Sequence, residues 1–441
     1  MDLKGQRVAI LGAGASGLAA AALALQHGAV VSAFDSGDPS GLEPAAERFS
    51  AIGVELVRGD AALVPPHRYD LVVVSPGIDV RFPIAAAFAG ASDELIGEIE
   101  LAFRYCDAPV VAVTGTNGKT TTTGLVADML SEAGLLAVAA GNIGLPFSEV
   151  VSSGVSYDWI VLELSSFQLE TISSFRPKVA VWMNFAPDHM DRYESVDDYR
   201  NAKLRIFENL APDDLAVYKH ESALDLPGPA VTFSAFSDDA DLCYRDGQIR
   251  ESASSRTFDF SACRLHGKHN AENVMVALAV ADYAGIGWER AAEAIRSFTP
   301  PPHRCEKIAT VDGVLYINDS KATNLHALES ALAGQEQPVI LIVGGKDKGL
   351  DFSEIVETAS GAVRHAVCIG EIAGEIREKW SGRVPCSEAA SLDDAVRSAR
   401  DAASEGDVVL FSPGTSSFDM FSNFEERGEA FRRAVTSLGK A

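Results

Sequence analysis

A run of glycine, threonine and lysine at 114–121, TGTNGKTT, has residue types suited to phosphate binding. It follows the apolar run 110–113 and precedes a stretch with helical residue types. A glycine loop between a buried strand and a helix points several backbone N–H groups at one spot, at the positive end of the helix dipole. There Lys119 could neutralise β- and γ-phosphate charge and the Thr120 hydroxyl could ligate Mg²⁺. The loop is a short form of the P-loop, because Val113 stands where its first glycine would be.

A second glycine loop, GAGASG at Gly12–Gly17, has the spacing of a dinucleotide-binding loop, and Asp35 ends the apolar run that follows. Such a loop lets a phosphate-bearing ligand approach the backbone. Taken alone, the pattern is compatible with an NAD(P)-dependent oxidoreductase and with a protein that binds another nucleotide diphosphate. The uncharged stretch 8–25 also resembles a signal peptide, but its glycines and alanines favour a folded βαβ unit.

Composition narrows the classes of partner. The 441 residues carry a formal net charge of −25, which repels nucleic acid backbones and anionic lipid, so we expect neither as a partner. We find no apolar run of transmembrane length. The six cysteines are scattered without a CxxC pair, which argues against a disulfide framework or a zinc–thiolate site and favours a reducing compartment. We therefore expect a cytoplasmic protein.

Apolar strand-like runs alternate with amphipathic helical stretches along almost the whole chain, which predicts an α/β fold with parallel sheets covered on both faces. Short strand-like pieces among Ser, Asp and Gly at 215–265 predict a small β lobe. Pro300–Pro302 is a stiff linker, and the last helix is expected from about Asp419. The predicted domains are 1–97 (Rossmann-like), 98–301 (P-loop ATPase-type) and 302–441 (Rossmann-like).

Polar residues recur where the later predicted strands end. Glu163 lies in LELSSFQLE, His189 lies in DHMDRY, and Lys203 lies on the helix that follows. A charged residue at the end of an apolar strand usually faces a binding site or a metal. Two further polar segments, NDSKATN at 318–324 and SFDMFSNFEERG at 417–428, follow strands near the C-terminus.

The order of these motifs and the residues in them resemble those of the Mur ligases of peptidoglycan synthesis. The resemblance extends along the whole chain and is strongest to the branch that adds D-glutamate. The resemblance implies three domains, which bind a UDP-sugar peptide, ATP and an amino acid. It implies an ATP-dependent amide ligase that joins D-glutamate to UDP-N-acetylmuramoyl-L-alanine through an acyl phosphate. It also implies that the loop 12–17 holds uridine diphosphate, with no redox cofactor. The DNPR motif of the diaminopimelate- or lysine-adding relatives is absent, which favours D-glutamate.

The resemblance also implies roles for single residues. Thr120 and Glu163 would ligate a first Mg²⁺ and His189 a second. Lys203 as an ammonium would repel that ion; the matching family lysine is carbamylated into an oxygen ligand, and we predict the same here. Asn142 would orient the reacting carboxylate. The residues expected to contact ATP are Gly115, Thr116, Asn117, Gly118, Lys119, Thr120, Thr121, Asn270, Asn273, Arg304, Asp319 and Lys321.

Two substrate sites follow from the same resemblance. Family members often carry a basic residue soon after Asp35, whereas Ser36 and Gly37 follow here, so one contact to the uridine diphosphate can differ. Phe418 and Phe424 are expected to pack as well as to line a site. The residues expected to bind the UDP substrate are Gly14, Ser16, Gly17, Asp35, Ser75 and Gly77, and those expected to surround D-glutamate are Thr323, Lys348, Ser417, Phe418 and Phe424.

Three alternatives remain open at this point. An NAD(P)-dependent oxidoreductase would leave 114–121 and 318–324 without a role. A nucleotide switch would hydrolyse ATP without ligation. Another ligase of the same family would use a different amino acid. For the ligase we expect a monomer that acts on small molecules only.

Overall fold

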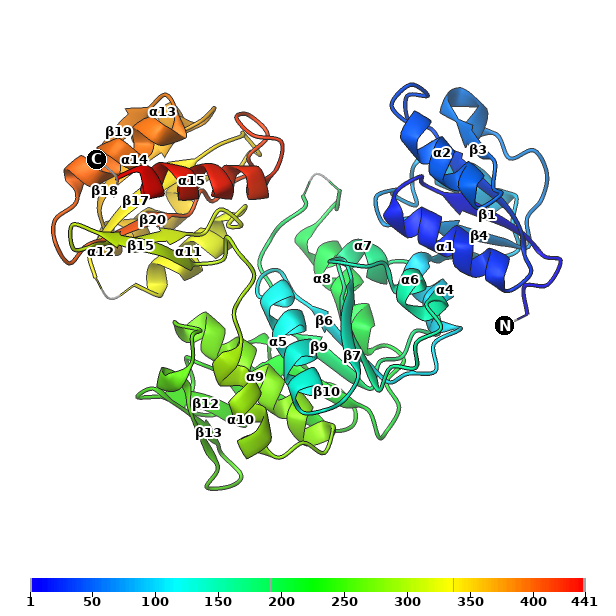
Figure 1. The fold of residues 1–441 in the computed structure, drawn as a ribbon, viewed down its shortest axis with the longest axis horizontal. Helices are drawn as coiled ribbons and strands as arrows, with labels where there is room; N and C mark the ends of the chain where they lie inside the picture. Colours follow the sequence, from blue (N-terminus) through cyan, green and yellow to red (C-terminus); the bar gives the residue numbers. More distant parts are fainter. Residues whose placement is uncertain (1, 191, 336, 439–441) are drawn as a thin grey trace. The chain divides into compact units, whose positions relative to one another are not determined.

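The computed structural model describes residues 2–190, 192–335 and 337–438 and contains three β-sheets of five, nine and six strands. The chain forms two compact units. One holds the residues up to Arg264 together with Ala271–Phe298, and the other holds Leu265–Asn270 and the residues from Thr299 onward. The first two sheets belong to the first unit and the third sheet to the second (Figure 1).

The first sheet has the order β3-β2-β1-β4-β5 and is parallel throughout. Successive residues of β1 are buried in two different core clusters, Val8 and Ile10 in one and Ala9 and Leu11 in the other, so helices cover both faces. The carboxyl ends of β1, β2 and β4 bring the Gly12 loop, Asp35 and Ser75 to one edge. The elements are β1 Arg7–Leu11, α1 Ala15–Gln26, β2 Val30–Asp35, α2 Glu43–Ala51, β3 Leu56–Arg58, η1 Gly59–Leu63, β4 Leu71–Val74, α3 Pro83–Gly90 and β5 Leu95–Gly97.

The second sheet has the order β14-β13-β12-β11-β10-β9-β6-β8-β7. The segment 215–265 is rich in β-strands, as predicted, but it does not form a small lobe of its own, because β10 pairs in parallel with β9 and the strands that follow continue the central sheet. Strand β10 is thereby paired on both sides, with β9 and with β11. Among the described strands of this sheet, the antiparallel pairs are β12 with β13 and β13 with β14. The strands are β6 Val110–Thr114, β7 Ala137–Gly141, β8 Trp159–Glu163, β9 Val179–Trp182, β10 Leu215–Lys219, β11 Ala230–Ser234, β12 Leu242–Arg245, β13 Gln248–Glu251 and β14 Thr257–Asp259, and the helices of this region are α4 Glu98–Phe103, α5 Lys119–Glu132, α6 Phe147–Ser152, α7 Ser166–Leu169, α8 Val196–Leu204, η2 Arg205–Phe207, η3 His220–Ser222, η4 Phe260–Ala262, α9 Lys268–Tyr283 and α10 Trp288–Ser297.

The third sheet has the order β15-β16-β20-β17-β18-β19, parallel except for β15 with β16. The last helix begins at Phe424, not near Asp419 as predicted. Residues before it form a turn, in which the Met420 N–H donates to the Ser417 carbonyl at 3.1 Å, and the Asn423 side chain accepts the Glu426 N–H at 2.7 Å. The elements are β15 Glu306–Val311, β16 Val314–Asn318, α11 Leu325–Ala333, β17 Val339–Gly344, η5 Phe352–Ile355, α12 Val356–Ala362, β18 Val363–Ile369, α13 Ala373–Lys379, β19 Cys386–Ala389, α14 Leu392–Ala402, β20 Val408–Phe411 and α15 Phe424–Leu438.

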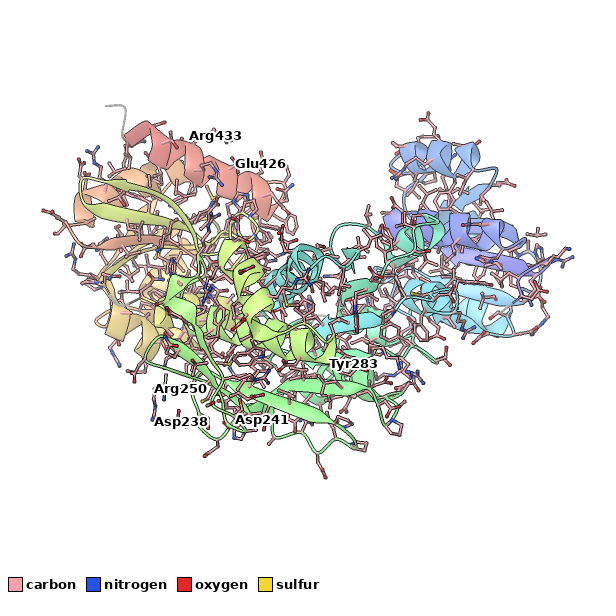
Figure 2. All side chains as sticks on the ribbon, turned by 60° about the horizontal axis from the view of Figure 1, so that its bottom comes forward. Asp238, Asp241, Arg250, Tyr283, Glu426 and Arg433 are labelled. Atoms are coloured by element: carbon pink, nitrogen blue, oxygen red, sulfur yellow. The ribbon has the colours of Figure 1, made fainter. Side chains whose placement is uncertain are left out.

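Figure 2 shows the side chains on these sheets, with Arg250 on β13 and Glu426 and Arg433 on α15. Within the described ranges, no helix combines the length and the apolar character that crossing a membrane requires. The fold thus confirms the predicted α/β class with mostly parallel sheets, and it leaves the chemistry to the carboxyl ends of the strands, where such sheets place their ligands.

Candidate active site

The loop between β6 and α5 is held by the loop that follows β9. The Thr116 hydroxyl donates to the Ala186 carbonyl at 3.0 Å, and the Asn117 N–H donates to Oδ1 of Asn184 at 2.9 Å. Gly118 caps α5 with φ +84°, the left-handed region that glycine adopts without strain. The structure thus places the predicted phosphate loop between a fully buried strand and a helix start, with its backbone fixed on one side.

Lys119 is the first residue of α5. Its Nζ donates to the carbonyls of Gly115 and Thr116, both at 2.9 Å. The ammonium therefore lies against the loop and not in open solvent. Phosphate oxygens are stronger hydrogen-bond acceptors than amide carbonyls, so a bound phosphate could take over these bonds.

Thr120, Glu163 and Asn142 meet beside this loop. The Thr120 hydroxyl donates to Oε2 of Glu163 at 2.6 Å, and Nδ2 of Asn142 donates to Oε1 at 2.8 Å. Parallel pairing causes the meeting, because Glu163 on β8 is in register with Val113 on β6 and Gly141 on β7. Glu163 is only 2% exposed.

This oxygen pair fits a magnesium ion, since Mg²⁺ takes hydroxyl and carboxylate ligands and is usually held by one or two protein groups plus phosphate oxygens. In the part of the chain that the structure describes, no group of three or more His, Cys, Asp or Glu residues is arranged to hold a metal. A magnesium ion at Thr120 and Glu163 would therefore depend on oxygens supplied by a ligand.

Lys203 reaches the phosphate loop from α8. It is 2% exposed, and its Nζ donates to the Gly115 carbonyl at 2.9 Å, the same oxygen that Lys119 contacts. Burial, and next the charge of Lys119, hold the pKa of the Lys203 amine well below its ordinary value. The site thus contains one ammonium on the loop and one buried amine that favours the neutral form.

His189 lies in an aromatic cluster close to that amine. Its ring is 5.0 Å from the Phe167 ring and 5.9 Å from the Tyr199 ring, and Nζ of Lys203 is 4.7 Å from the centre of Tyr199. The backbone of His189 has φ +58°, uncommon for a residue with a side chain. Backbone strain of this kind is frequent at functional sites.

The predicted UDP-binding residues gather at the carboxyl edge of the first sheet. Asp35 accepts the N–H groups of Ala13 at 2.8 Å and Gly37 at 2.9 Å, so its carboxylate closes the glycine loop. A Cβ at Gly17 would lie 1.9 Å from the Gly12 carbonyl oxygen, and one at Gly12 would lie 2.8 Å from Ser75, so helix, loop and turn need both glycines. Gly14 is the N-cap of α1, Ser16 lies in the first turn of that helix, and Gly77 lies in the turn after β4.

The predicted ATP residues outside the phosphate loop divide between the two compact units. Asn273 belongs to the first unit, where its Oδ1 accepts the Thr122 hydroxyl at 3.0 Å and thus touches the phosphate helix; Thr121 beside Thr122 is buried in that helix. The others belong to the second unit. They are Asn270, Arg304, Asp319 and Lys321.

The predicted D-glutamate residues lie around the loops that follow β16, β17 and β20. Lys348 Nζ donates to the Thr323 carbonyl at 3.3 Å, and Ser417 is buried. Phe424 lies 4.1 Å from the Lys321 ammonium. The expectation that Phe418 packs is wrong, because its side chain is 71% exposed at the turn before α15.

Asp319 is buried at the end of β16. It accepts the Ser412 hydroxyl at 2.8 Å and the Cys305 N–H at 3.1 Å, and burial raises its pKa to about 6. The folded unit therefore binds a proton on this carboxyl more tightly than the unfolded chain does. The stabilising effect is complete below about pH 4 and is lost as the pH rises through about 6.

We expect Asp319→Asn to remove this pH dependence. Relative to Asp319→Asn, the wild type should lose about 2 kcal/mol in its free energy of unfolding when the pH is raised from about 4.5 to about 8. Urea titrations of both proteins at the two pH values measure it. A difference that does not change with pH would contradict the raised pKa.

Comparison with known proteins identifies the family. Residues 113–281 match the family model described as "Mur ligase middle domain", and residues 303–415 match "Mur ligase, glutamate ligase domain". The UDP-N-acetylmuramoylalanine--D-glutamate ligase of Geobacter metallireducens is 39% identical over 448 residues, which cover 100% of this chain and 99% of that protein. The chain belongs to the Mur ligase family. The same-named ligase of Syntrophotalea carbinolica is 39% identical and covers 99% of each chain.

Solved structures agree on the fold of this Mur ligase. UDP-N-acetylmuramate-alanine ligase MurC from Thermotoga maritima has a TM-score of 0.61 at 18% identity and covers 98% of this chain and 99% of its own. MurF ligase from Thermotoga maritima in complex with ADP has a TM-score of 0.62 at 18% identity and covers 84% of this chain and 96% of its own.

Sequence reasoning assigned no role to two arginines of this Mur ligase, of which Arg427 is buried and Arg192 has a side chain that is only 12% exposed. Arg427 is 1% exposed and donates to the carbonyls of Ser320 at 2.7 Å and Thr415 at 3.1 Å, so it joins the loops after β16 and β20. Arg192 joins the first sheet to the second. Their positions inside the motifs SFDMFSNFEERG and DHMDRY could have indicated that they have a role at the site.

Proposed function

We propose that this Mur ligase is an ATP-dependent enzyme that joins D-glutamate to UDP-N-acetylmuramoyl-L-alanine. The observation that carries the proposal is the contact between Thr120 and Glu163 beside the phosphate loop. An oxygen pair at that place suits the cation that accompanies a nucleotide triphosphate, and a redox enzyme has no use for it. The printed name of the full-length relatives supplies the two other substrates.

The chemistry follows from the weak reactivity of a carboxylate toward amines. ATP transfers its γ-phosphoryl group to the terminal carboxylate of the sugar peptide, which forms an acyl phosphate and ADP. The amine of D-glutamate then attacks the acyl carbon, loses a proton, and phosphate leaves as the amide forms. The first step brings polyanions together, so cationic groups must offset their repulsion.

The chain's own residues can supply that compensation. Lys119 would move its hydrogen bonds from the loop carbonyls to the β- and γ-phosphate oxygens, and the backbone from Gly115 to Thr120 would hold the rest of the phosphate tail. Thr120 and Glu163 would hold a magnesium ion that offsets phosphate charge when bound. Asn142, fixed by its bond to Glu163, would orient the reacting carboxylate.

We propose a second magnesium site at His189 and a carbamylated Lys203. The neutral Lys203 amine would attack carbon dioxide, so that a C–N bond forms, one proton leaves and a carbamate with anionic oxygens results. The burial of Lys203 and its contact with the same carbonyl as Lys119 support the proposal, because two ammonium groups there would repel each other.

We further propose that the three sheets mark three domains with the predicted bounds. Residues 1–97 would bind the UDP moiety and residues 98–301 would bind ATP. Residues 302–441 would bind D-glutamate, with Lys348 paired to one of its carboxylates. The grouping of the predicted residues at the carboxyl ends of each sheet supports this division.

A phosphate-release assay over several amino acids tests the function. With ATP, Mg²⁺ and UDP-N-acetylmuramoyl-L-alanine present, we expect turnover with D-glutamate and none with L-glutamate or a diamino acid. Equal or faster turnover with those amino acids would overturn the specificity. Phosphate release that needs no amino acid would favour a hydrolase, and nicotinamide reduction would favour an oxidoreductase.

A further inference from the structure

Arg192, three residues after His189, connects the first two sheets. Although arginine is usually a surface residue, its side chain is only 12% exposed. Nη1 donates to the carbonyl of Pro76 at 3.1 Å, and Nη2 donates to Oε2 of Glu170 at 2.8 Å. Pro76 belongs to the turn after β4 and Glu170 follows α7. One guanidinium therefore bonds to the turn after β4 of the first sheet and to the end of α7, which lies beside the second sheet's strands in the chain, within the same compact unit.

The first sheet holds Arg192 at further points. Its Nε lies 3.6 Å from Oδ2 of Asp79 and, although buried, has no hydrogen-bond partner among the described residues. Asp79 is 5% exposed and also pairs with Arg81 at 2.6 Å, a hydrogen-bonded pair that lowers the pKa of Asp79 to about 2. Arg81 in turn donates to the backbone carbonyl of Arg192. Both the side chain and the backbone of Arg192 are thus held by the turn after β4 and the residues that follow it.

From Arg192, contacts continue into the proposed metal site. Its guanidinium carbon lies 3.9 Å from the centre of the Phe167 ring, a cation–π distance. The Phe167 ring meets His189 at 5.0 Å, His189 meets Tyr199 at 5.9 Å, and Tyr199 lies 4.7 Å from the Lys203 amine. A change in the position of Arg192 would therefore reach His189 both along the chain and through the Phe167 ring.

We propose that Arg192 is a positioning residue that holds His189 at a fixed place relative to the turn Ser75–Gly77. On the proposed function, on which this inference rests, the turn binds the UDP moiety and His189 lies near the free carboxylate at the other end of the same substrate. The guanidinium suits this role because its planar fork donates in two directions at once, which an ammonium cannot do in fixed geometry. Displacement of a reacting group by about 1 Å can lower a rate about 100-fold.

Steady-state kinetics of Arg192→Met and Arg192→Lys test the proposal. For Arg192→Met we expect kcat/KM for the UDP-sugar peptide to fall on the order of 100-fold, while the KM for ATP changes less than about threefold. Arg192→Lys, which keeps the charge but not the fork, should fall between this variant and the wild type. A kcat/KM for the UDP-sugar peptide within about threefold of wild type, or an equal rise of all KM values, would overturn the proposal. If Arg192→Met does not fold, Arg192→Lys serves for the same comparison.

Arg256→Met is the matched control. Arg256 is also a guanidinium of this unit that lies against an aromatic ring; it pairs with Glu251 and, at 2.8 Å, with Asp282, and its guanidinium carbon lies 4.6 Å from the centre of the Trp288 ring, all within the second sheet's part of the chain. Its loss should lower the free energy of unfolding and leave kcat/KM for the UDP-sugar peptide within about threefold of wild type.

Hydrogen–deuterium exchange separates this inference from the proposed function, since it needs no turnover. UDP-N-acetylmuramoyl-L-alanine should protect residues 75–77 and 188–190 in the wild type, and Arg192→Met should keep the first protection and lose the second. Coupled protection in an enzyme that does not ligate D-glutamate would overturn only the function. Protection of 188–190 that persists in Arg192→Met would overturn only the role of Arg192.

Discussion

Replacing Lys119 by methionine is expected to lower kcat for ATP-dependent phosphate release by a factor on the order of 10³ or more. Methionine keeps much of the apolar stem and removes the ammonium that donates to the Gly115 and Thr116 carbonyls, the first of which also accepts from the Lys203 amine. Single cationic groups at a transferring phosphoryl group contribute about 10³ to 10⁵ in kcat in comparable sites. The effect should be large here because the formal net charge of −25 makes the overall electrostatic field of the protein repel the γ-phosphate. Phosphate release at saturating substrates measures it.

Lys178→Met is the control for this variant. Lys178 precedes β9, at the amino end of the strands and so at the opposite edge of the sheet from the phosphate loop, and it pairs with Asp214 at 2.8 Å. We expect its activity to stay within about twofold of wild type, since partly exposed ion pairs contribute little. Activity of Lys119→Met within about threefold of wild type would show that Lys119 does not act on the phosphate tail.

The parts of this site that sequence could predict are those that follow from local patterns. A buried strand, two glycines and a helix start specify the phosphate loop within a single stretch of chain, and the structure confirms its position. The meeting of Glu163 with Thr120 needs one further rule, that parallel strands end at the same edge. Neighbouring β6 and β8 obey it, with Val113 opposite Glu163.

The errors arose where the outcome depends on a distant partner. Nothing near Leu215 indicates that β10 will pair with β9 and extend the central sheet, so the sequence predicts a small β lobe there and not further strands of that sheet. The start of α15 depends on the Asn423 side chain, which accepts an N–H of the first turn, and not on the apolar pattern. Phe418 is apolar and yet exposed, because the turn before α15 directs it away from the core.

Arg192 shows the same dependence on distant partners for a charged residue. Its type predicts exposure, and its burial follows from partners at Pro76 and Asp79, more than 100 residues earlier. The sequence thus indicated which side chains have suitable chemistry, but it did not indicate which residues hold them in place. The contacts of Arg192 join segments that are far apart in the sequence, so the local pattern of apolar and polar residues does not predict them.

Replacing Lys203 by alanine is expected to lower kcat on the order of 10³-fold or more, and small carboxylates such as formate should restore part of it. An ammonium at this place, bonded to the same carbonyl as Lys119, would add to the repulsion of a cation, whereas a carbamate provides anionic oxygens. Alanine leaves a gap in which a free carboxylate can take the place of those oxygens. Phosphate release with and without added carboxylate measures both effects.

The control is again Lys178, changed to alanine, which should keep its activity and gain nothing from added carboxylate. ¹³C NMR with labelled bicarbonate gives a readout besides activity, since the wild type should show a carbamate resonance that Lys203→Ala lacks. The neutral amine reacts with carbon dioxide, and burial lowers the pKa of Lys203, so the carbamate resonance should weaken as the pH is lowered and more of the amine is protonated. A near-normal rate in Lys203→Ala without any carboxylate would contradict the role of Lys203 as a metal ligand, because an alanine offers the ion no oxygen at all.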